Sequence, residues 1–202
     1  MRNSLAERID HRTRHWHERP MSDQENLDHL IASVSAAAAD PALWTACVEE
    51  LSTLLGSAAV VLTLRPPRSG RIDCVVTAGI APDFRRAYAD TYYARDPWVQ
   101  RMAARPAGIA FGYELVPRWD LLRTDFYRDW MAPQGLLPEL TVTGRILKRG
   151  KRPVSTLAAF RRRGTRMLRL EDVDLLRQLL PYLQRAVRSF GRVDGKSAKR
   201  SY

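Results

Sequence analysis

The sequence predicts an α+β fold in which an antiparallel sheet of about five strands carries helices on both faces. Three observations support this. Helical and strand-like periodicities succeed one another along residues 23–190 in the order α-α-β-β-α-β-α-β-β-α. Strand-like runs that are adjacent in the chain are joined by short turns, which favours antiparallel pairing. An apolar fraction of 45% in 202 residues is enough for one packed domain.

Two helices open the domain. The first is predicted over residues 23–38, because Ser22 is a typical N-cap residue and acids follow it in the first turn. Asp40-Pro41 then provides a cap and a proline start for a second helix, which ends at Gly56. Both helices have a broad apolar face, so both are expected to pack on the sheet.

The middle of the chain alternates strands with helices. Residues 58–64 and 72–78 are strand-like runs on either side of a turn and predict a hairpin. The elements expected next are a helix over 82–104 interrupted at Asp96-Pro97, a strand over 108–115 and a short aromatic-rich helix over 120–131.

The last third predicts a second hairpin and a long helix. Strands are expected over 140–147 and 154–160, joined by a basic turn over 148–152. A helix over 170–190 follows, with acids in its first turn. Residues 1–22 and 191–202 are expected to be disordered basic extensions, and Met21 is a candidate translation start.

The formal net charge of +11 is concentrated in a few segments. Five of these charge units lie in the two extensions. Ten Lys and Arg residues fall within 145–169 with no acid among them, and the rest of the body is mildly acidic. One hypothesis is a nucleic-acid surface at 145–169, but no groove-entering helix or set of stacking aromatics accompanies these charges. The alternative is that they occupy solvated turns around a strand.

The residues needed for common catalytic chemistry are missing from the predicted domain. No histidine occurs after His29, so there is no imidazole base or ligand beyond it. Cys47 and Cys74 fall at core positions of a helix and a strand, and no phosphate-binding glycine loop occurs. We therefore expect no enzyme, no cofactor and no metal site; His11, His15 and His17 lack the further ligands that a convincing site needs. Without a signal peptide or an apolar span, the expected location is cytoplasmic.

The last predicted helix has the spacing of a coiled-coil seam. Its apolar residues recur at intervals of three and four, which makes dimerisation through this helix one interpretation and packing on the sheet the other. Pro181 is expected to kink or split the helix near Leu180. The seam consists of Val173, Leu176, Leu180, Leu183, Val187 and Phe190.

Four short motifs, taken in order and spacing, resemble a known family. They are Tyr92-Tyr93-Ala94-Arg95-Asp96-Pro97-Trp98, Glu114-Leu115-Val116-Pro117, Phe126-Tyr127-Arg128-Asp129-Trp130-Met131 with Pro133-Gln134-Gly135-Leu136, and Leu179-Leu180-Pro181-Tyr182-Leu183-Gln184-Arg185-Ala186. Together they resemble the N-terminal sensor domain of bacterial LuxR-type helix-turn-helix regulators, a GAF- or PAS-like module, over about residues 24–190.

The resemblance implies a pocket for a small effector on one face of the sheet. Asp96-Pro97 is similar to the Asp-Pro step of acyl-homoserine-lactone-binding relatives, in which the Asp accepts a hydrogen bond from the ligand amide. Residues 80–88 lack the Trp that those relatives carry, so the sequence departs from that ligand class. The alternative from the residues alone is that Asp96 caps a helix and the aromatics form plain core. The implied ligand-binding residues are Tyr92, Tyr93, Asp96, Trp98, Phe111 and Trp130.

The resemblance also implies a DNA-binding module after residue 190, of about 60 residues with a recognition helix. Twelve residues follow residue 190 here, so DNA would be reached only through a missing domain or an intact partner regulator. The expected function is small-molecule sensing by a homodimeric regulatory domain, with a ligand-free dimerisation or interaction module as the alternative.

Overall fold

Five strands form one antiparallel sheet in the order β2-β1-β5-β4-β3 in the computed structural model. The structure describes residues 22–56, 58–64, 74–149 and 152–197, and among these it leaves out the side chains at 74, 138–140, 148–149, 152–154 and 190–197. Both predicted hairpins are confirmed by pairing of β1 with β2 and of β4 with β5. The strands are β1 Ala59–Leu64, β2 Cys74–Ala78, β3 Gly108–Phe111, β4 Leu136–Arg149 and β5 Arg152–Arg162.

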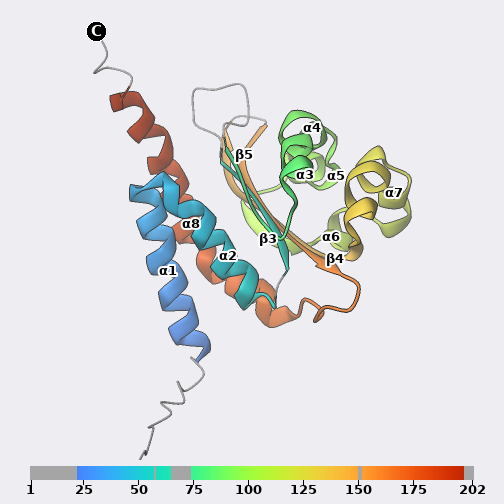
Figure 1. Ribbon diagram of the computed structural model, residues 1–202, viewed down its shortest axis with the longest axis horizontal. Coiled ribbons are helices and arrows are strands. Elements are labelled where there is room, and N and C mark those ends of the chain that lie inside the picture. The colour runs from blue at the N-terminus through green and yellow to red at the C-terminus, as the bar shows by residue number, and fades with distance from the viewer. Residues whose placement is uncertain (1–21, 57, 65–73, 150–151, 198–202) are drawn as a thin grey trace, which may run out of the picture.

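Helices cover both faces of this sheet, as the sequence predicts (Figure 1). One face carries α1 Asp23–Ala39, α2 Trp44–Leu54 with the preceding 3₁₀ turn η1 Pro41–Leu43, and α8 Leu170–Ser197. The other face carries a series of short helices and turns: α3 Pro82–Ala87, η2 Tyr88–Tyr92, α4 Tyr93–Arg95, α5 Pro97–Met102, α6 Gly112–Leu115, α7 Arg118–Leu122, η3 Phe126–Met131 and η4 Ala132–Gln134.

Alternation along the strands divides the interior into two cores. In β1, Val60 and Leu62 pack beneath α1, α2 and α8, whereas Ala59 and Val61 pack beneath the short helices. We call the first the three-helix core. The second is dominated by an aromatic cluster, defined as Tyr88, Trp98, Phe126, Trp130 and Phe160.

The helix starts follow the capping signals in the sequence. Ser22 and Glu25 form a reciprocal capping box at α1, in which the Glu25 backbone N–H donates to the Ser22 hydroxyl and the Ser22 N–H donates to the Glu25 carboxylate. Asp40 accepts a 3.0 Å hydrogen bond from the Ala42 N–H where η1 begins. Buried Cys47 lies in the three-helix core, and desolvation raises the pKa of its thiol to about 12.

Two predicted elements in the middle of the chain have different bounds in the structure. The strand expected over 108–115 stops at Phe111, and Gly112–Leu115 forms the helical turn α6, which carries Leu115 into the aromatic side of the interior. The helix expected over 120–131 is divided between α7 and η3. Thr124 causes the division: its hydroxyl donates to the Leu121 carbonyl at 2.7 Å and accepts the Tyr127 N–H at 3.1 Å, which starts a new turn.

The seam on α8 belongs to the chain's own core. Val173, Leu176, Leu183 and Val187 are each at most 2% exposed and pack in the three-helix core, and Leu180 is half-buried against it. The packing alternative is therefore the correct one for these five residues, because a buried face is not available to a second chain. The side chain of Phe190 lies outside the described residues.

The helix also continues further than expected. It is not split at Pro181, which lies on its exposed side together with Arg177 four residues earlier, so the carbonyl left without a donor can be hydrated. It ends at Ser197 rather than near Phe190, so the first part of the predicted C-terminal tail is helical.

Candidate functional site

The carboxylate of Asp96 is the polar centre of the short-helix side of the molecule. It lies just before α5, is 1% exposed, and accepts three hydrogen bonds. Oδ1 accepts the backbone N–H groups of Trp98 at 2.8 Å and Val99 at 3.2 Å, which is ordinary N-capping. Oδ2 accepts the Tyr88 hydroxyl at 2.9 Å. Asp96 therefore both caps a helix and fixes a buried tyrosine.

Burial sets the electrostatics of this pair. Desolvation raises the pKa of Asp96 to about 6, although the hydrogen bonds from Tyr88, Val99 and Trp98 each act to lower it. Desolvation and the nearby Asp96 charge also raise the pKa of Tyr88 well above its usual value. The pair therefore consists of a neutral phenol donating to a carboxyl group that titrates unusually close to neutrality.

The aromatic cluster surrounds this pair. The ring centroids of Tyr88 and Trp130 are 4.9 Å apart, and those of Phe126 and Trp130 are 5.0 Å apart. Trp98 contacts Phe126 edge-on at 6.0 Å and Phe160 of β5 at 5.9 Å. These distances are those of directly packed aromatic rings.

Each of the two indole N–H groups in the aromatic cluster has a specific acceptor. Trp98 Nε1 donates to the Gly112 carbonyl and Trp130 Nε1 donates to the Phe84 carbonyl, both at 2.9 Å. A Cβ at position 112 would lie 2.9 Å from Trp98 Nε1, so only glycine allows the indole to approach this closely. The position of Trp98 is thus fixed at both its backbone and its ring.

Two of the turns that supply the cluster are π-helical. The turn η2 includes Tyr88 and Tyr92, and η3 includes Phe126 and Trp130. Such turns are rare inside α-helical segments and occur frequently at functional sites. Here they allow neighbouring aromatic residues to face the same interior.

Five of the six sequence-predicted ligand residues gather on this side. Asp96, Trp98 and Trp130 are fully buried, while Tyr92 and Tyr93 pack at the margin of the same core. Phe111 is the exception: it packs against the three-helix core on the opposite face, and its ring stacks on Tyr113 at 5.3 Å. Its place follows from period-two alternation, because its neighbour Ala110 is the β3 residue that faces the aromatic cluster.

Three participants were not among the predicted site residues. Tyr88 donates to Asp96, and Phe126 and Phe160 complete the ring contacts. The spacing of eight residues between Tyr88 and Asp96, about two helical turns, is a signal that could have identified Tyr88. Nothing local identifies Phe160, because its contact with Trp98 depends on sheet pairing.

The basic segment 145–169 does not form a continuous charged surface among its described side chains. Arg145 and Arg161 are buried, Arg162 donates to the Gln134 and Gly79 carbonyls, and Arg166 pairs with Asp172. Of the ten basic residues, Arg163 and Arg169 are the exposed ones with described side chains. The side chains of Lys148, Arg149, Lys151 and Arg152 lie outside the described residues.

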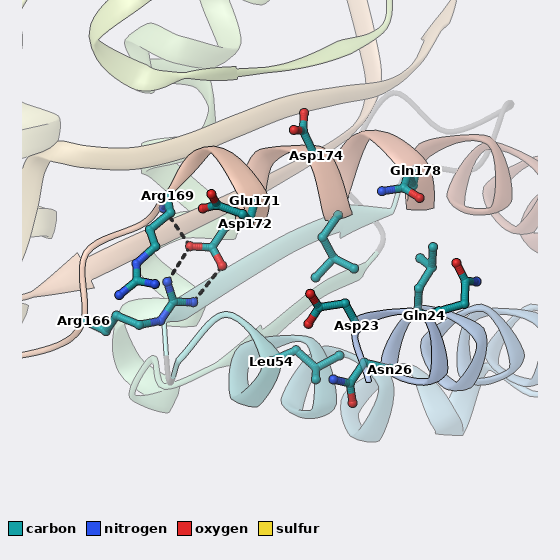
Figure 2. Close-up of a pocket in the computed structure, with 12 residues that line it drawn as sticks. Asp23, Gln24, Asn26, Leu54, Arg166, Arg169, Glu171, Asp172, Asp174 and Gln178 are labelled. Carbon is teal, nitrogen blue, oxygen red and sulfur yellow. Dashed lines mark hydrogen bonds and ion pairs between the residues drawn. The ribbon is translucent and has the colours of Figure 1, made fainter. Parts of the chain in front are cut away.

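Two surface pockets lie on the opposite, three-helix side. The larger has a volume of about 490 Å³ and lies between the first turns of α1 and α8, where acidic side chains such as Glu171 and the basic side chains of Arg166 and Arg169 line it (Figure 2). Figure 2 also shows Asp172 turned towards Arg166 and hydrogen-bonded to it, at 2.7 and 2.9 Å. The smaller, of about 300 Å³, lies between α1 and α8 near Tyr182. Neither pocket contacts the aromatic cluster.

Metal and membrane features are not found in the described residues. No group of three or more His, Cys, Asp or Glu side chains in the described ranges could hold a metal ion, and His11, His15 and His17 lie outside those ranges. No helix within the described part of the chain is both long and apolar enough to cross a membrane.

Comparison with known proteins gives a likeness of fold. The LBD domain of VqsR from Pseudomonas aeruginosa matches with a TM-score of 0.53 and 13% identity, over 81% of this chain and 94% of that domain. The chromophore-binding domain of the bacteriophytochrome RpBphP3 from R. palustris matches with a TM-score of 0.50 and 12% identity, over 87% of this chain and 65% of that one. A phycoerythrobilin-bound GAF domain from a cyanobacterial phytochrome matches with a TM-score of 0.47 and 12% identity, over 88% of this chain and 100% of that domain.

Sequence comparisons add nothing to this likeness, because no family model and no curated protein matches the chain. The predicted α+β architecture is confirmed, and so is the expected resemblance to LuxR-type sensor domains at the level of fold. The chain has an α+β fold that resembles the fold of the LBD domain of VqsR.

Proposed function

We propose that this chain is a regulatory domain that senses a small molecule on the short-helix face of its sheet. The observation that carries the proposal is the buried Asp96–Tyr88 pair within the aromatic cluster. Small-molecule sites typically combine a few polar groups with apolar walls in this way. The likeness to a domain named LBD supports a binding role.

Asp96 has a defined chemical role in this proposal. Its carboxyl group can accept a hydrogen bond from a ligand N–H or O–H, or donate one when protonated, and its pKa of about 6 makes both forms accessible. The packed rings imply that a ligand enters by displacing an aromatic side chain; Tyr92 and Tyr93, at the margin of the core, are the candidates.

A thermal-shift screen tests this proposal. The purified domain is heated with fractions of a small-molecule extract from the source cells, and Asp96→Asn is compared with Asp90→Asn, an exposed carboxylate in the same helical region. We expect at least one fraction to raise the Tm of the wild-type protein and of Asp90→Asn, and to raise that of Asp96→Asn at most weakly. No active fraction, or equal shifts in both variants, would contradict the proposal.

A second candidate function is a ligand-free interaction module. The close packing of the aromatic cluster favours it, as does Trp119, which is 72% exposed on α7. Pull-down from a cell lysate with wild-type protein and Trp119→Ala separates this candidate from the first: an interaction module that uses α7 loses its partner in the variant, whereas a small-molecule sensor keeps its thermal shift.

A further inference from the structure

A buried polar row crosses the sheet on the same face as the aromatic cluster. Thr63 of β1 lies opposite Thr156 of β5, and Thr156 lies opposite Arg145 of β4. Thr63 and Thr156 have the same strand parity as Val61 and Ala158, which face the short helices. Thr63, Thr156 and Arg145 are 1%, 4% and 1% exposed, so the row is hidden from solvent.

The guanidinium of Arg145 has no counter-charge in this row. Nη1 donates to the carbonyls of Met102 at 3.0 Å and Ala103 at 3.2 Å, at the end of α5. Nε is buried and has no hydrogen-bond partner. No carboxylate among the described residues forms an ion pair with it, and a buried charge without such a partner is costly.

Arg161 provides a contrast within the same chain. It too is buried with an unpartnered Nε, but it lies on the three-helix side, and its two Nη atoms donate to the Gly56 and Leu55 carbonyls at the end of α2. Desolvation and the nearby Arg166 charge lower the pKa of Arg161, and the Asp172 charge acts in the opposite direction, whereas desolvation alone acts on Arg145 and lowers its pKa. Among the described residues, Arg145 is thus a buried guanidinium with no charged group acting on its pKa.

Neighbouring hydroxyl groups add hydrogen-bonding capacity beside Arg145. The hydroxyls of Thr63 and Thr156 are 2.7 Å apart, and Thr63 Oγ1 also accepts the Thr156 N–H at 2.9 Å. If Thr63 donates to Thr156, the hydroxyl proton of Thr156 is free to bind an additional acceptor. Thr156 is the cross-strand neighbour of Arg145, with Cβ atoms about 5 Å apart in such pairs.

The helix α5 links this row to the aromatic cluster. Met102, whose carbonyl binds Arg145, is four residues from Trp98, so the two lie on one face of the helix about 6 Å apart. On the sheet beneath them, the small residues Thr143 and Ala158 separate the row from Phe160. The polar row and the aromatic cluster are therefore neighbours on the same face of the sheet.

We propose that Arg145 anchors a carboxylate group of the sensed molecule through Nε and Thr156, while the apolar body of that molecule lies against the aromatic cluster. This inference rests on the proposed sensing function and specifies its ligand class: small aromatic or aliphatic monocarboxylates. Guanidinium–carboxylate pairs are strong and directional, and such a pair compensates the buried charge.

Calorimetric titration with a matched pair of probes tests the proposal. Phenylacetate and phenylacetamide differ in the charge of the head group and are otherwise nearly isosteric. We expect phenylacetate to bind the wild-type protein at least tenfold more tightly than phenylacetamide does. In Arg145→Met, the affinity for phenylacetate should fall at least tenfold. Arg163→Met removes an exposed positive charge just after β5 and should bind phenylacetate within twofold of wild type.

A spectroscopic readout covers the case in which Arg145→Met does not fold. In ¹⁵N-labelled wild-type protein, the Nε–H signal of Arg145, assigned by its loss in Arg145→Lys, should shift on addition of phenylacetate and not of phenylacetamide. Equal binding of the two probes, no binding of either, an unchanged affinity in Arg145→Met or an unmoved Nε–H signal would each overturn the proposal.

The two proposals fail separately. If neutral fractions of the cell extract shift the Tm of the wild-type protein while phenylacetate does not bind, sensing stands and the role of Arg145 is wrong. If neither the extract nor phenylacetate binds, both proposals fall.

Discussion

The buried carboxyl group of Asp96 combines a structural and a chemical role. It completes the N-terminus of α5 by accepting the Trp98 and Val99 N–H groups, and it holds the Tyr88 hydroxyl at 2.9 Å. The structure shows the helix cap that was one of the two interpretations of Asp96, and binding of a ligand by Asp96 is our proposal. The protonation of the Asp96 carboxyl group can be followed by experiment.

The stability of the domain should depend on pH through Asp96. The folded-state pKa is about 6, above the ordinary value near 3.8, so the folded state binds the proton more tightly than the unfolded state does. The resulting stabilisation is fully present below about pH 4 and is lost as the pH rises through about 6. Two pKa units correspond to about 3 kcal/mol.

Urea denaturation of the wild-type protein and Asp96→Asn between pH 4 and 7.5 measures this effect. The difference in unfolding free energy, wild type minus variant, should decrease by about 3 kcal/mol over this range. Subtracting the variant removes the contribution of the other carboxylates. A difference that is flat with pH, or that increases, would contradict the raised pKa.

At the scale of elements, the start of α8 depends on one ion pair. Asp172 accepts Arg166 Nη1 at 2.9 Å, Arg166 Nη2 at 2.7 Å and the Arg169 backbone N–H at 2.8 Å. The Asp172 side chain is 8% exposed, whereas its neighbour Asp174 is 60% exposed and pairs with Arg177 on the surface. Asp172 and Asp174 are two residues apart on α8 and differ in burial.

Asp172→Asn should therefore lower the unfolding free energy by about 2 kcal/mol, because the partly buried Arg166 guanidinium loses its carboxylate partner. Asp174→Asn should change it by less than about 1 kcal/mol, as is typical of exposed pairs. Chemical denaturation of both variants at the same pH provides the comparison. Equal losses would show that Asp172 acts only as a surface charge.

The helices and strands also show which structural features a sequence pattern can predict and which it cannot. The order of helices and strands, the capping box at Ser22 and the interruption at Asp96-Pro97 depend on local signals, so they could be predicted. The heptad-like spacing on α8 could not distinguish the chain's own core from a partner, because both bury the same stripe. Phe111 was assigned to the site although the parity of its strand places it on the opposite face.

At the scale of the whole molecule, the sheet separates a three-helix core from the aromatic cluster (Figure 1). Trp98 and Trp130 of the cluster were predicted from the aromatic-rich motifs, but Tyr88, Phe126, Phe160 and the link to Arg145 were not. Arg145 was one of ten basic residues in a stretch that looked like solvated turns, and only strand pairing and the position of α5 reveal its burial. The overall charge therefore obscured the basic side chain for which we propose a binding role.

The central claim is that a small molecule binds on the aromatic side of the sheet, and the indole N–H signals of ¹⁵N-labelled protein test it most directly. Trp98 and Trp130 lie in the aromatic cluster, Trp44 lies in the three-helix core, and Trp119 is on the surface. On titration with an active extract fraction, we expect the signals of Trp98 and Trp130 to shift while those of Trp44 and Trp119 stay in place. Shifts confined to Trp44 or Trp119, or no shift at all, would contradict the account.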